Sequence, residues 1–431
     1  MNTSAVTPPS PKPSDTYELV RLGYVARLQN GLTVDAKRDV TGDVVTSPYL
    51  RVANVQAGSL DLESVTEITV PRSVAQRSTL RPGDVLMTEG GDLDKLGRGT
   101  VWQGELDRCL HQNHIFAVRP DAQRLSGRFL AYVTQSLYGR HYFESTGTRT
   151  TNLASTNSSK IQSFPLPLPP LDEQRRIADF LDAETARIDA LTRAYVKLRE
   201  LVSERSQRVI DSEIEQHQNL TPFRYLVRFR EGPGIMAVDF HDEGIPLIRI
   251  SGLHRGEVTL NGCNFLDPEK VSRQWSQFRL KLGDRLISGS ATMGGVSVVR
   301  DPAVIGSIPY TGLIILRPAR QDVDMKYVEA FLRSSLFSRQ IDVLKTGATM
   351  QHFGPTHLSQ VQAPMPSHHE QLRIVENVQA ALAHASRCDD LANRQLALLT
   401  ERRQALITAA VTGQFDVSTA SGRNVTDGVT A

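Results

Sequence analysis

Hydrophobic positions along the chain follow two different periods. Within residues 17–165 and 221–366, short β-branched runs alternate apolar and polar positions and are bounded by Gly, Pro and Asp. Such alternation predicts half-buried strands separated by turns. In each stretch the runs are followed by a segment with apolar residues at three-four spacing, Gly127–Ser145 in the first and Met325–Leu344 in the second. We expect one helical segment there, and therefore an α+β globule in each stretch.

Long helical patterns follow each globule. Apolar residues then recur about every 3.5 positions, which is the heptad period of packed helices. The first stripe contains Ile177, Leu181, Ile188, Leu191, Tyr195, Leu198, Val202 and Val209, and the second contains Ile374, Val378, Ala381, Ala385, Cys388, Ala392, Gln395, Leu399 and Leu406. The first stripe is bulky and the second is small in its middle, which suits mutual packing. We predict two helices of about forty residues, each about 60 Å long, packed as an antiparallel coiled coil.

The two halves of the chain repeat one plan. The phrase FPLPLPPLDEQRRI at Phe164–Ile177 returns as APMPSHHEQLRI at Ala363–Ile374, and YLRVANV at Tyr49–Val55 returns as LIRISGL at Leu247–Leu253. Several landmarks recur in order at offsets of 197 to 200 positions, which indicates a pseudo-twofold internal repeat. The predicted order is a disordered leader (1–16), a first recognition domain (17–165), a first spacer helix (166–220), a second recognition domain (221–366), a second spacer helix (367–413) and a tail (414–431).

Composition places the chain in a broad class. Its 431 residues exceed what one core normally serves, and 40% hydrophobic with 22% charged residues is typical of globular proteins. Apolar runs such as Gly312–Leu316 are too short to span a bilayer, and the leader lacks the apolar core of a signal peptide. Three widely separated cysteines favour a reducing compartment, so we expect a cytoplasmic protein without membrane contact.

Two globules on a rigid spacer suit a partner that repeats along an axis. Double-stranded DNA is the commonest such partner, and two-domain proteins bind its half-sites at a spacing set by protein geometry. The globules differ most in their loops, so we expect each to recognise a different base pattern. A net charge of +2 neither requires nor excludes nucleic acid, because a local basic face decides that.

The motifs are specific enough to name a family. The proline ladder with LDEQRRIADFLDAETARIDAL, the segment LLTERRQALITAAVTGQFDV at Leu398–Val417 and the twofold plan resemble the DNA specificity subunits of Type I restriction–modification systems. GDVLMTEGGDLDKLGRGTVW at Gly83–Trp102 and HQNHIFAVRP at His111–Pro120 resemble the target-recognition domains of that family. In the second copy the phrase APMPSHHEQ is two residues shorter than FPLPLPPLDEQ in the first, and we assign residues 414–431 to no pattern.

The resemblance implies both fold and partners. It implies two α+β target-recognition domains alternating with two helical spacers, and a bipartite asymmetric DNA target. It also implies two methyltransferase subunits, which modify adenine N6 with S-adenosylmethionine, and restriction subunits that use ATP and Mg²⁺ to translocate and cut DNA. The chain itself would hold no cofactor or metal and would not be an enzyme.

Candidate DNA contacts lie in polar loops between the predicted strands. Arg pairs well with guanine, and Asn or Gln with adenine, while Lys and Arg hold phosphates. The candidates in the first copy are Arg51, Asn54, Glu89, Gly90, Lys95, Arg98, Gln112, Asn113, Arg149, Thr150, Asn152 and Lys160. Those in the second copy are Arg249, Ser251, Ser290, Thr292, Tyr310, Thr311, Thr349, Gln351 and His352. Arg51 and Arg249 stand at equivalent positions of the two copies, so a framework role is equally compatible with them. Residues that differ between the copies are better candidates for specificity.

Catalytic motifs are missing from the sequence. No NPPY-like methyltransferase motif or GxxxxGK phosphate loop occurs, and the CxHxxH pattern of Cys109, His111 and His114 lacks a fourth zinc ligand at suitable spacing. The acids of Asp239–Gly244 are better explained as a solvated loop than as a nuclease site. Two alternatives stay open: a DNA enzyme with an unrecognised site, which would methylate or cut alone, and a protein-only scaffold, which would be indifferent to DNA at any salt concentration.

Overall fold

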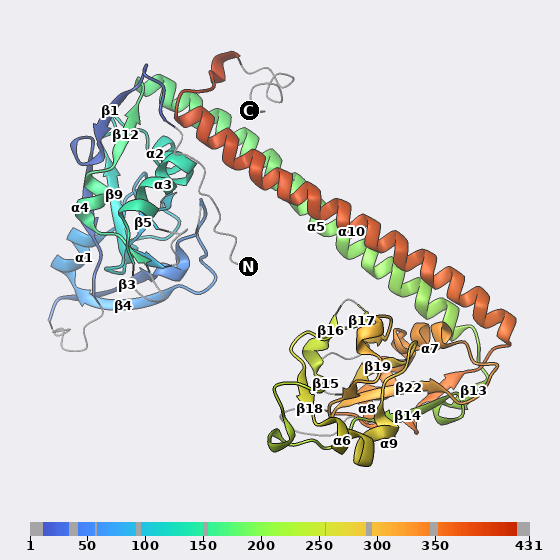
Figure 1. Ribbon diagram of the computed structural model, residues 1–431. Helices are drawn as coiled ribbons and strands as arrows, with labels where there is room; N and C mark the ends of the chain where they lie inside the picture. The colour runs from blue at the N-terminus through green and yellow to red at the C-terminus, as the bar shows by residue number, and fades with distance from the viewer. Residues whose placement is uncertain are drawn as a thin grey trace. The chain divides into compact units, whose positions relative to one another are not determined.

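The computed structural model describes residues 12–33, 42–56, 58–91, 96–149, 154–254, 256–289, 295–344 and 352–419. Contacts divide the chain into two compact units, which are described separately. Unit 1 consists of Met1–Tyr195 with Arg394–Ala431, and unit 2 consists of Val196–Asn393. Each unit contains strands, short helices and parts of two long helices, α5 (Leu171–Glu215) and α10 (His368–Val411) (Figure 1). The predicted α+β class and the long helices are therefore present.

Unit 1 is built on small sheets. β1 (Glu18–Arg21) pairs antiparallel with β12 (Pro165–Leu168), so the proline ladder of the sequence is a strand. The largest sheet has the order β2 (Ala26–Asn30), β9 (Ile115–Pro120), β5 (Val85–Thr88) and β7 (Gly99–Val101). A second has the order β4 (Thr66–Pro71), β3 (Val44–Leu50) and β8 (Leu110–His111), and a third has β10 (Thr148–Arg149), β11 (Ala154–Ser155) and β6 (Gly90–Gly91). The remaining helices are α1 (Arg72–Ser78), α2 (Gly127–Gln135), α3 (Leu137–Thr146) and α4 (Ser158–Gln162).

Unit 2 has similar strand orders, with two further strands in its main sheet. β13 (Leu220–Pro222) pairs with β23 (Gln362–Pro364). The main sheet has the order β14 (Val227–Glu231), β22 (Leu313–Pro318), β19 (Arg285–Ser288), β20 (Val296–Val298), β17 (Glu257–Val258) and β16 (Leu253–His254), and a second has β18 (Asn264–Leu266), β15 (Ile245–Ile248) and β21 (Ile308–Pro309). The remaining helices are α6 (Pro268–Lys270), α7 (Met325–Leu332), α8 (Ser335–Leu344) and α9 (Pro355–Leu358).

The helical segment of each globule is broken in two, whereas the sequence pattern predicts one helix. In unit 1 the break is Ser136, whose backbone is extended and whose hydroxyl accepts a hydrogen bond from the Gly139 amide at 3.1 Å. In unit 2 the Ser334 hydroxyl accepts the corresponding bond from Phe337 at 3.3 Å. A serine that caps a following helix ends the preceding one, because its side chain replaces the missing backbone acceptor. The three-four spacing continues across the break and conceals it.

Both globules share a core with the long helices. In unit 1 the cluster around Phe129, Phe143 and Phe164 includes Ile177 of α5 and Leu406 of α10. In unit 2, Phe223 and Phe331 cluster with two residues of α5 and three of α10, which are Ile210, Ile214, Ile374, Val375 and Val378. Burying these side chains contributes roughly 1.5–3 kcal/mol each, so neither globule is independent of its helix ends.

The middle of the helical stripe is less buried than its ends. Ile177, Leu181 and Ile188 are buried, whereas Leu191 and Leu198 are each 45% exposed. Polar contacts supplement the packing between α5 and α10 within each unit. Arg403 pairs with Asp189 in unit 1, and in unit 2 Arg199 pairs with Asp389 at 2.5 Å and Asn377 donates to Glu213 at 2.7 Å.

Buried polar side chains fix each globule to the start of a long helix. Gln174, in the EQ phrase at the start of α5, accepts a hydrogen bond from the Ser126 amide at 2.9 Å and donates to the carbonyls of Arg124 and Pro169 at 2.9 and 2.8 Å. Its counterpart Gln371 accepts from Asp324 and donates to Asp322 and Pro366. The repeated EQ phrase therefore corresponds to a repeated helix anchor. Among the helices of the described residues, none has an apolar stretch of the length that a bilayer crossing requires.

Candidate nucleic-acid interface

In unit 1, the predicted contacts Arg51, Gln112 and Asn113 lie together where β3 ends and β8 leads into β9. Gln112 Oε1 accepts a hydrogen bond from the Val52 amide at 3.4 Å, directly after Arg51, and the Asn113 amide donates to Leu32 at 3.0 Å. A Cβ on Gly31 would lie 2.1 Å from the Gln112 carbonyl, so only glycine allows this close approach. Arg51 is exposed, and the residues Gln112 and Asn113 with their side-chain amides are half-buried. An arginine and two amides in this arrangement provide the donors and acceptors that base edges require.

A second group adjoins the first through His114. Its ring nitrogen Nδ1 lies 2.5 Å from Glu89 Oε2, and the Glu89 carbonyl accepts from the Thr156 amide at 2.7 Å. Gly90 pairs with Ser155, and Ser155 pairs with Thr148. The Lys160 ammonium group donates to the Thr148 hydroxyl at 2.9 Å. The structure therefore brings Glu89, Gly90 and Lys160 to the same edge of unit 1 as the first group.

Two predicted contacts of unit 1 do not belong to this edge. Asn54 is only 2% exposed, and its amide donates to the Asp61 carbonyl at 2.8 Å while its Oδ1 accepts from Arg51 at 2.8 Å. Its side chain therefore holds a turn and presents no group to a base. Arg98 lines a cavity of about 230 Å³ beside Gln404 and Ile407 of α10. Sequence position placed Arg98 in a polar loop, but in the structure the residue lies beside α10.

The fold places the three residues of the CxHxxH pattern, Cys109, His111 and His114, in different surroundings. Cys109 and His111 are buried, and burial raises the pKa of the Cys109 thiol to about 12 and lowers the pKa of His111 to about 4. His111 Nδ1 lies 2.9 Å from the Ile115 carbonyl, so the neutral ring donates inward, whereas His114 points outward to Glu89. His111 therefore does not face the edge formed by Arg51, Gln112 and Glu89. No group of three or more potential metal ligands occurs within the part of the chain that the structure describes.

In unit 2, Arg249 is at the centre of the corresponding edge. Its NH1 group donates to Asn264 Oδ1 at 2.8 Å, and its guanidinium carbon lies 4.8 Å from the centre of the Tyr310 ring and 5.9 Å from that of Phe240. The Tyr310 amide donates to the Ile248 carbonyl at 2.9 Å. Aromatic rings on a guanidinium restrict its rotation and orient its remaining donors. Arg249 is thus a positioned side chain, whereas Arg51 has no aromatic ring within cation–π distance in the described residues.

Three other predicted contacts of unit 2 lie within the described residues. The Ser251 hydroxyl donates to the Asn261 carbonyl at 3.1 Å, and the Thr311 hydroxyl donates to the Pro233 carbonyl at 2.7 Å. His352 is exposed next to Phe353, whose amide donates to Gly289 at 3.0 Å. Hydroxyls that donate to the backbone keep their lone pairs for an incoming donor. The predicted residues outside the described positions are Lys95, Thr150, Asn152, Ser290, Thr292, Thr349 and Gln351, and of Arg149 only the backbone is described.

The structure adds residues that the sequence pattern did not indicate. Met236 and Val238 are exposed at the tip of the loop that carries Phe240 toward Arg249. Apolar side chains at such a tip suit contact with a thymine methyl group or a base step. Asp239, expected among solvated acids, forms an ion pair with Lys270, whose hydrogen bond is the main cause of its lowered pKa. The sequence Gly-Pro-Gly at 232–234 is a turn signal from which this loop could have been found.

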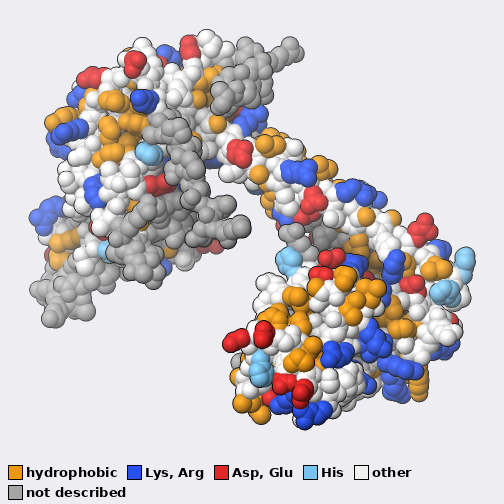
Figure 2. Space-filling model, viewed as in Figure 1, with side chains coloured by type: hydrophobic (Ala, Val, Ile, Leu, Met, Phe, Trp, Pro, Cys, Tyr) orange, Lys and Arg blue, Asp and Glu red, His pale blue; other side chains and the backbone are white. Residues whose placement is uncertain are grey.

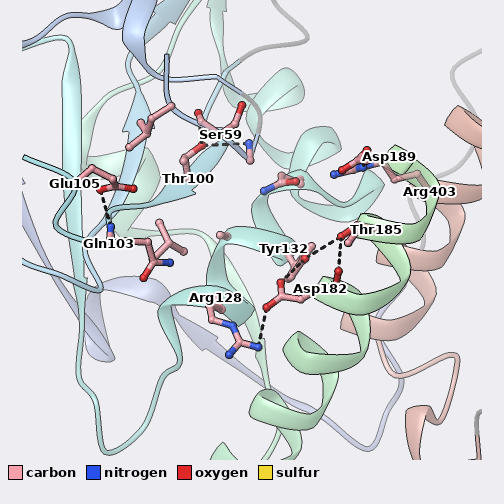
Figure 3. Close-up of a pocket in the computed structure, with 16 residues that line it drawn as sticks. Ser59, Thr100, Gln103, Glu105, Arg128, Tyr132, Asp182, Thr185, Asp189 and Arg403 are labelled. Atoms are coloured by element: carbon pink, nitrogen blue, oxygen red, sulfur yellow. Dashed lines mark hydrogen bonds and ion pairs between the residues drawn. The ribbon is translucent and has the colours of Figure 1, made fainter. Parts of the chain in front are cut away.

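A cavity of about 370 Å³ in unit 1 lies away from this edge. Figure 3 shows its lining side chains meeting between α2 and α5: the Tyr132 hydroxyl donates to Asp182 at 2.6 Å, and Arg128 pairs with Asp182 at 2.9 Å. Burial and the Asp182 hydrogen bond raise the pKa of Tyr132 above its ordinary value. Arg128 Nε is buried without a hydrogen-bond partner, whereas the contacts of Arg128 and Tyr132 with Asp182 hold α2 of the globule on α5.

Comparison with known proteins shows what this chain is similar to. The model of the Type I restriction modification DNA specificity domain matches residues 14–198. The Type I restriction enzyme EcoKI specificity subunit of Escherichia coli (strain K12) is 24% identical over 393 residues, which cover 85% of this chain and 82% of that protein. Residues 14–198 thus match a Type I restriction modification DNA specificity domain, and the chain over most of its length is similar to Type I restriction enzyme specificity subunits.

Two solved structures share the fold. One, from work on complex assembly and conformational transition of the type I R-M system, has a TM-score of 0.76 at 19% identity and covers 94% of this chain and 100% of that one. The other, the HsdS subunit from Thermoanaerobacter tengcongensis, has a TM-score of 0.57 at 19% identity and covers 94% of this chain and 99% of that one. The α+β class predicted from the sequence is confirmed.

Proposed function

We propose that this chain is the DNA-specificity subunit of a Type I restriction–modification complex and recognises a bipartite asymmetric target. The observation that carries the proposal is a common framework with different polar groups at the same edge. Unit 1 presents Arg51 with Gln112 and Asn113, whereas unit 2 presents Arg249 between Tyr310 and Phe240. A shared framework docks on DNA in one way, and the different side chains then select different base patterns. Unit 1 would recognise one half-site and unit 2 the other.

The long helices would set the number of unrecognised base pairs between the half-sites. Similar strand orders in the two units and polar contacts between α5 and α10 support an internal duplication joined by an antiparallel coiled coil. The exposed apolar residues Leu191 and Leu198 suit the docking of partner helices on this spacer. In this arrangement the helices act both as spacer and as attachment point for the methyltransferase and restriction subunits.

The chemistry would belong to the partners. Two methyltransferase subunits would supply S-adenosylmethionine and the adenine N6 chemistry, with the target adenine taken out of the stack, and restriction subunits would supply ATP- and Mg²⁺-dependent cleavage. In this division of labour the present chain is non-catalytic and binds no cofactor. Its residues contribute position and sequence selection alone.

A methylome tests the proposal directly. The chain is expressed with its neighbouring methyltransferase subunit, and modified adenines are mapped by single-molecule sequencing. A two-part motif with a fixed gap, present only when this chain is included, is the expected result. An assembled complex without chain-dependent methylation would refute the proposal and favour a protein-only scaffold.

The division of roles between globules and helices has its own test. Exchanging residues 17–165 for the corresponding domain of another family member should change one half-site only, because the second globule is untouched. Adding two turns to both long helices should lengthen the gap and leave both half-sites as they were. A change in the bases recognised after helix extension would contradict the spacer role.

A further inference from the structure

Exposed hydrophobic side chains of the two globules point to a surface that both units share. Outside α5 and α10, the described part of unit 1 exposes two large hydrophobic residues, Leu19 at 52% and Tyr24 at 71%. Unit 2 exposes Leu220 at 50% and Tyr225 at 53%. Leu19 and Leu220 are 201 positions apart, and so are Tyr24 and Tyr225. The two leucines, like the two tyrosines, occupy the same place in the corresponding strand–turn segments. The other exposed hydrophobics of the unit 2 globule have no such counterpart in unit 1.

The strand pairing around these residues is the same in both units. Leu19 of β1 lies opposite Pro167 of β12, and Leu220 of β13 lies opposite Pro364 of β23. Each tyrosine ends a short 3₁₀ turn, and the next residue's carbonyl accepts a hydrogen bond at 2.8 Å in unit 1 and 2.9 Å in unit 2. The two segments therefore hold their side chains on equivalent backbone.

Basic residues adjoin each tyrosine. Arg27, three residues after Tyr24, is exposed and lies across the sheet from Arg119, and Arg228, three residues after Tyr225, is exposed and lies across from Arg317. Figure 2 shows Lys and Arg side chains gathered over the β14 side of unit 2. Among the described residues, neither Arg27 nor Arg228 forms an ion pair.

An equivalent, partly buried ion pair lies beside each arginine on the neighbouring strand. Arg119 binds both oxygens of Asp84 at 2.7 Å, and Arg317 binds both oxygens of Asp284 at 2.8 and 2.6 Å. The amides of Arg81 and Lys281 donate to these aspartates at 2.8 Å, and their side chains are exposed beside them. Both aspartates are thus already neutralised, which leaves Arg27 and Arg228 as uncompensated positive charge at the surface.

Structural need does not explain this match. The exposed leucine, tyrosine and arginine fill no core, so drift between the copies would cost little stability. Specific base recognition does not explain it either, because the two half-sites differ and a base contact would differ with them. A surface that is the same in both units suits a partner that is itself the same at both places.

We propose that Leu19, Tyr24 and Arg27 of unit 1 and Leu220, Tyr225 and Arg228 of unit 2 form two equivalent docking surfaces for two copies of one protein. The occupant presents an apolar depression for the leucine and tyrosine and a carboxylate for the arginine. Tyrosine and arginine are the residues that most often dominate protein interfaces. Under the proposed function, on which this inference rests, the occupant is the methyltransferase subunit, which contacts these surfaces in addition to the long helices.

The test counts methyltransferase subunits bound to variants of the full chain. One variant carries Leu19→Ser, Tyr24→Ser and Arg27→Glu, a second carries the corresponding three changes in unit 2, and a third carries all six. Native mass spectrometry of complexes with the neighbouring methyltransferase should show two copies on the unchanged chain, one on each triple variant and none on the third. Binding at each altered surface should weaken at least about tenfold.

Control variants separate docking from general damage. Ile305→Ser with Val343→Ser removes exposed hydrophobics that have no counterpart in unit 1 and should leave two copies bound. Circular dichroism melting of the triple variants should match that of the unchanged chain, because all the altered side chains are exposed. DNA affinity of the isolated chain, measured at two salt concentrations, should also be unchanged.

Each contrary result has a definite meaning. Two methyltransferase copies retained on the third variant would overturn the inference and leave the proposed function intact. Lost DNA affinity with both copies retained would show that the arginines hold phosphates of flanking DNA, which also overturns it. If the unchanged chain binds no methyltransferase, the proposed function fails and this inference fails with it.

Discussion

The anchor between each globule and its helix can be tested at Gln174. This side chain is fully buried at the start of α5, and it makes three hydrogen bonds of 2.8–2.9 Å to the backbone of Ser126, Arg124 and Pro169. Gln174→Leu keeps the approximate volume and the helix propensity but removes the amide. The substitution therefore isolates the hydrogen bonds.

The expected loss follows from those three bonds. Each contributes about 1 kcal/mol net, and the Ser126 amide, left buried without an acceptor, adds roughly 1–2 kcal/mol. Leucine returns part of this through apolar contact, of the order of 1 kcal/mol. We expect the free energy of unfolding of unit 1 to fall by about 3–4 kcal/mol.

Tryptophan fluorescence can report on one unit at a time. The chain has two tryptophans, and Trp102 is buried in unit 1 while Trp275 belongs to unit 2. In a Trp275→Phe background, urea unfolding followed at Trp102 measures unit 1. Gln371→Leu, the matched change in unit 2, should alter this transition by less than about 0.5 kcal/mol, because distant sites are nearly independent.

Two results would refute the reasoning. A loss below about 1 kcal/mol for Gln174→Leu would mean that the three bonds contribute little beyond what water provides in the unfolded chain. An equal loss in the Trp102 transition for Gln371→Leu would mean that the effect does not arise at this anchor.

Three further predictions use the same measurements or DNA binding. Because burial lowers the pKa of His111 from 6.5 to about 4, the unfolded chain binds more protons between these values, so unfolding free energy should decrease by about 3 kcal/mol as pH falls through this window. In the Trp102 assay, His111→Gln should flatten that dependence, and an unchanged slope would exclude His111 as its source. Asp84→Ala leaves the partly buried Arg119 without its partner and should cost about 3–5 kcal/mol, with Asp43→Ala, at an exposed ion pair, costing less than about 1 kcal/mol as the control. Lys160→Met should weaken binding to specific and random duplexes alike and reduce the slope of log affinity against log salt by about 0.9; a loss confined to one sequence would instead indicate base recognition by Lys160.

Much of the candidate site was within reach of the sequence, but its assembly was not. Polar loops between predicted strands included Arg51, Gln112, Glu89 and Lys160, which the structure brings to one edge through contacts such as Lys160 with Thr148. The same reasoning included Asn54, which is buried in a turn. Local polarity does not reveal which side of a loop faces water, because that depends on strands that are distant in sequence.

Local pattern by itself determined that each globule contains strands and turns, where the long helices lie and which phrases repeat, because periodicity and turn chemistry act over a few residues. Only the tertiary structure decided that Ser136 splits a helix, that Gln174 anchors α5, and that Phe240 and Tyr310 hold Arg249. It also showed that Tyr24 and Tyr225 remain exposed at equivalent positions. Exposure and side-chain contact are properties of the packed chain, and residues far apart in sequence create them together.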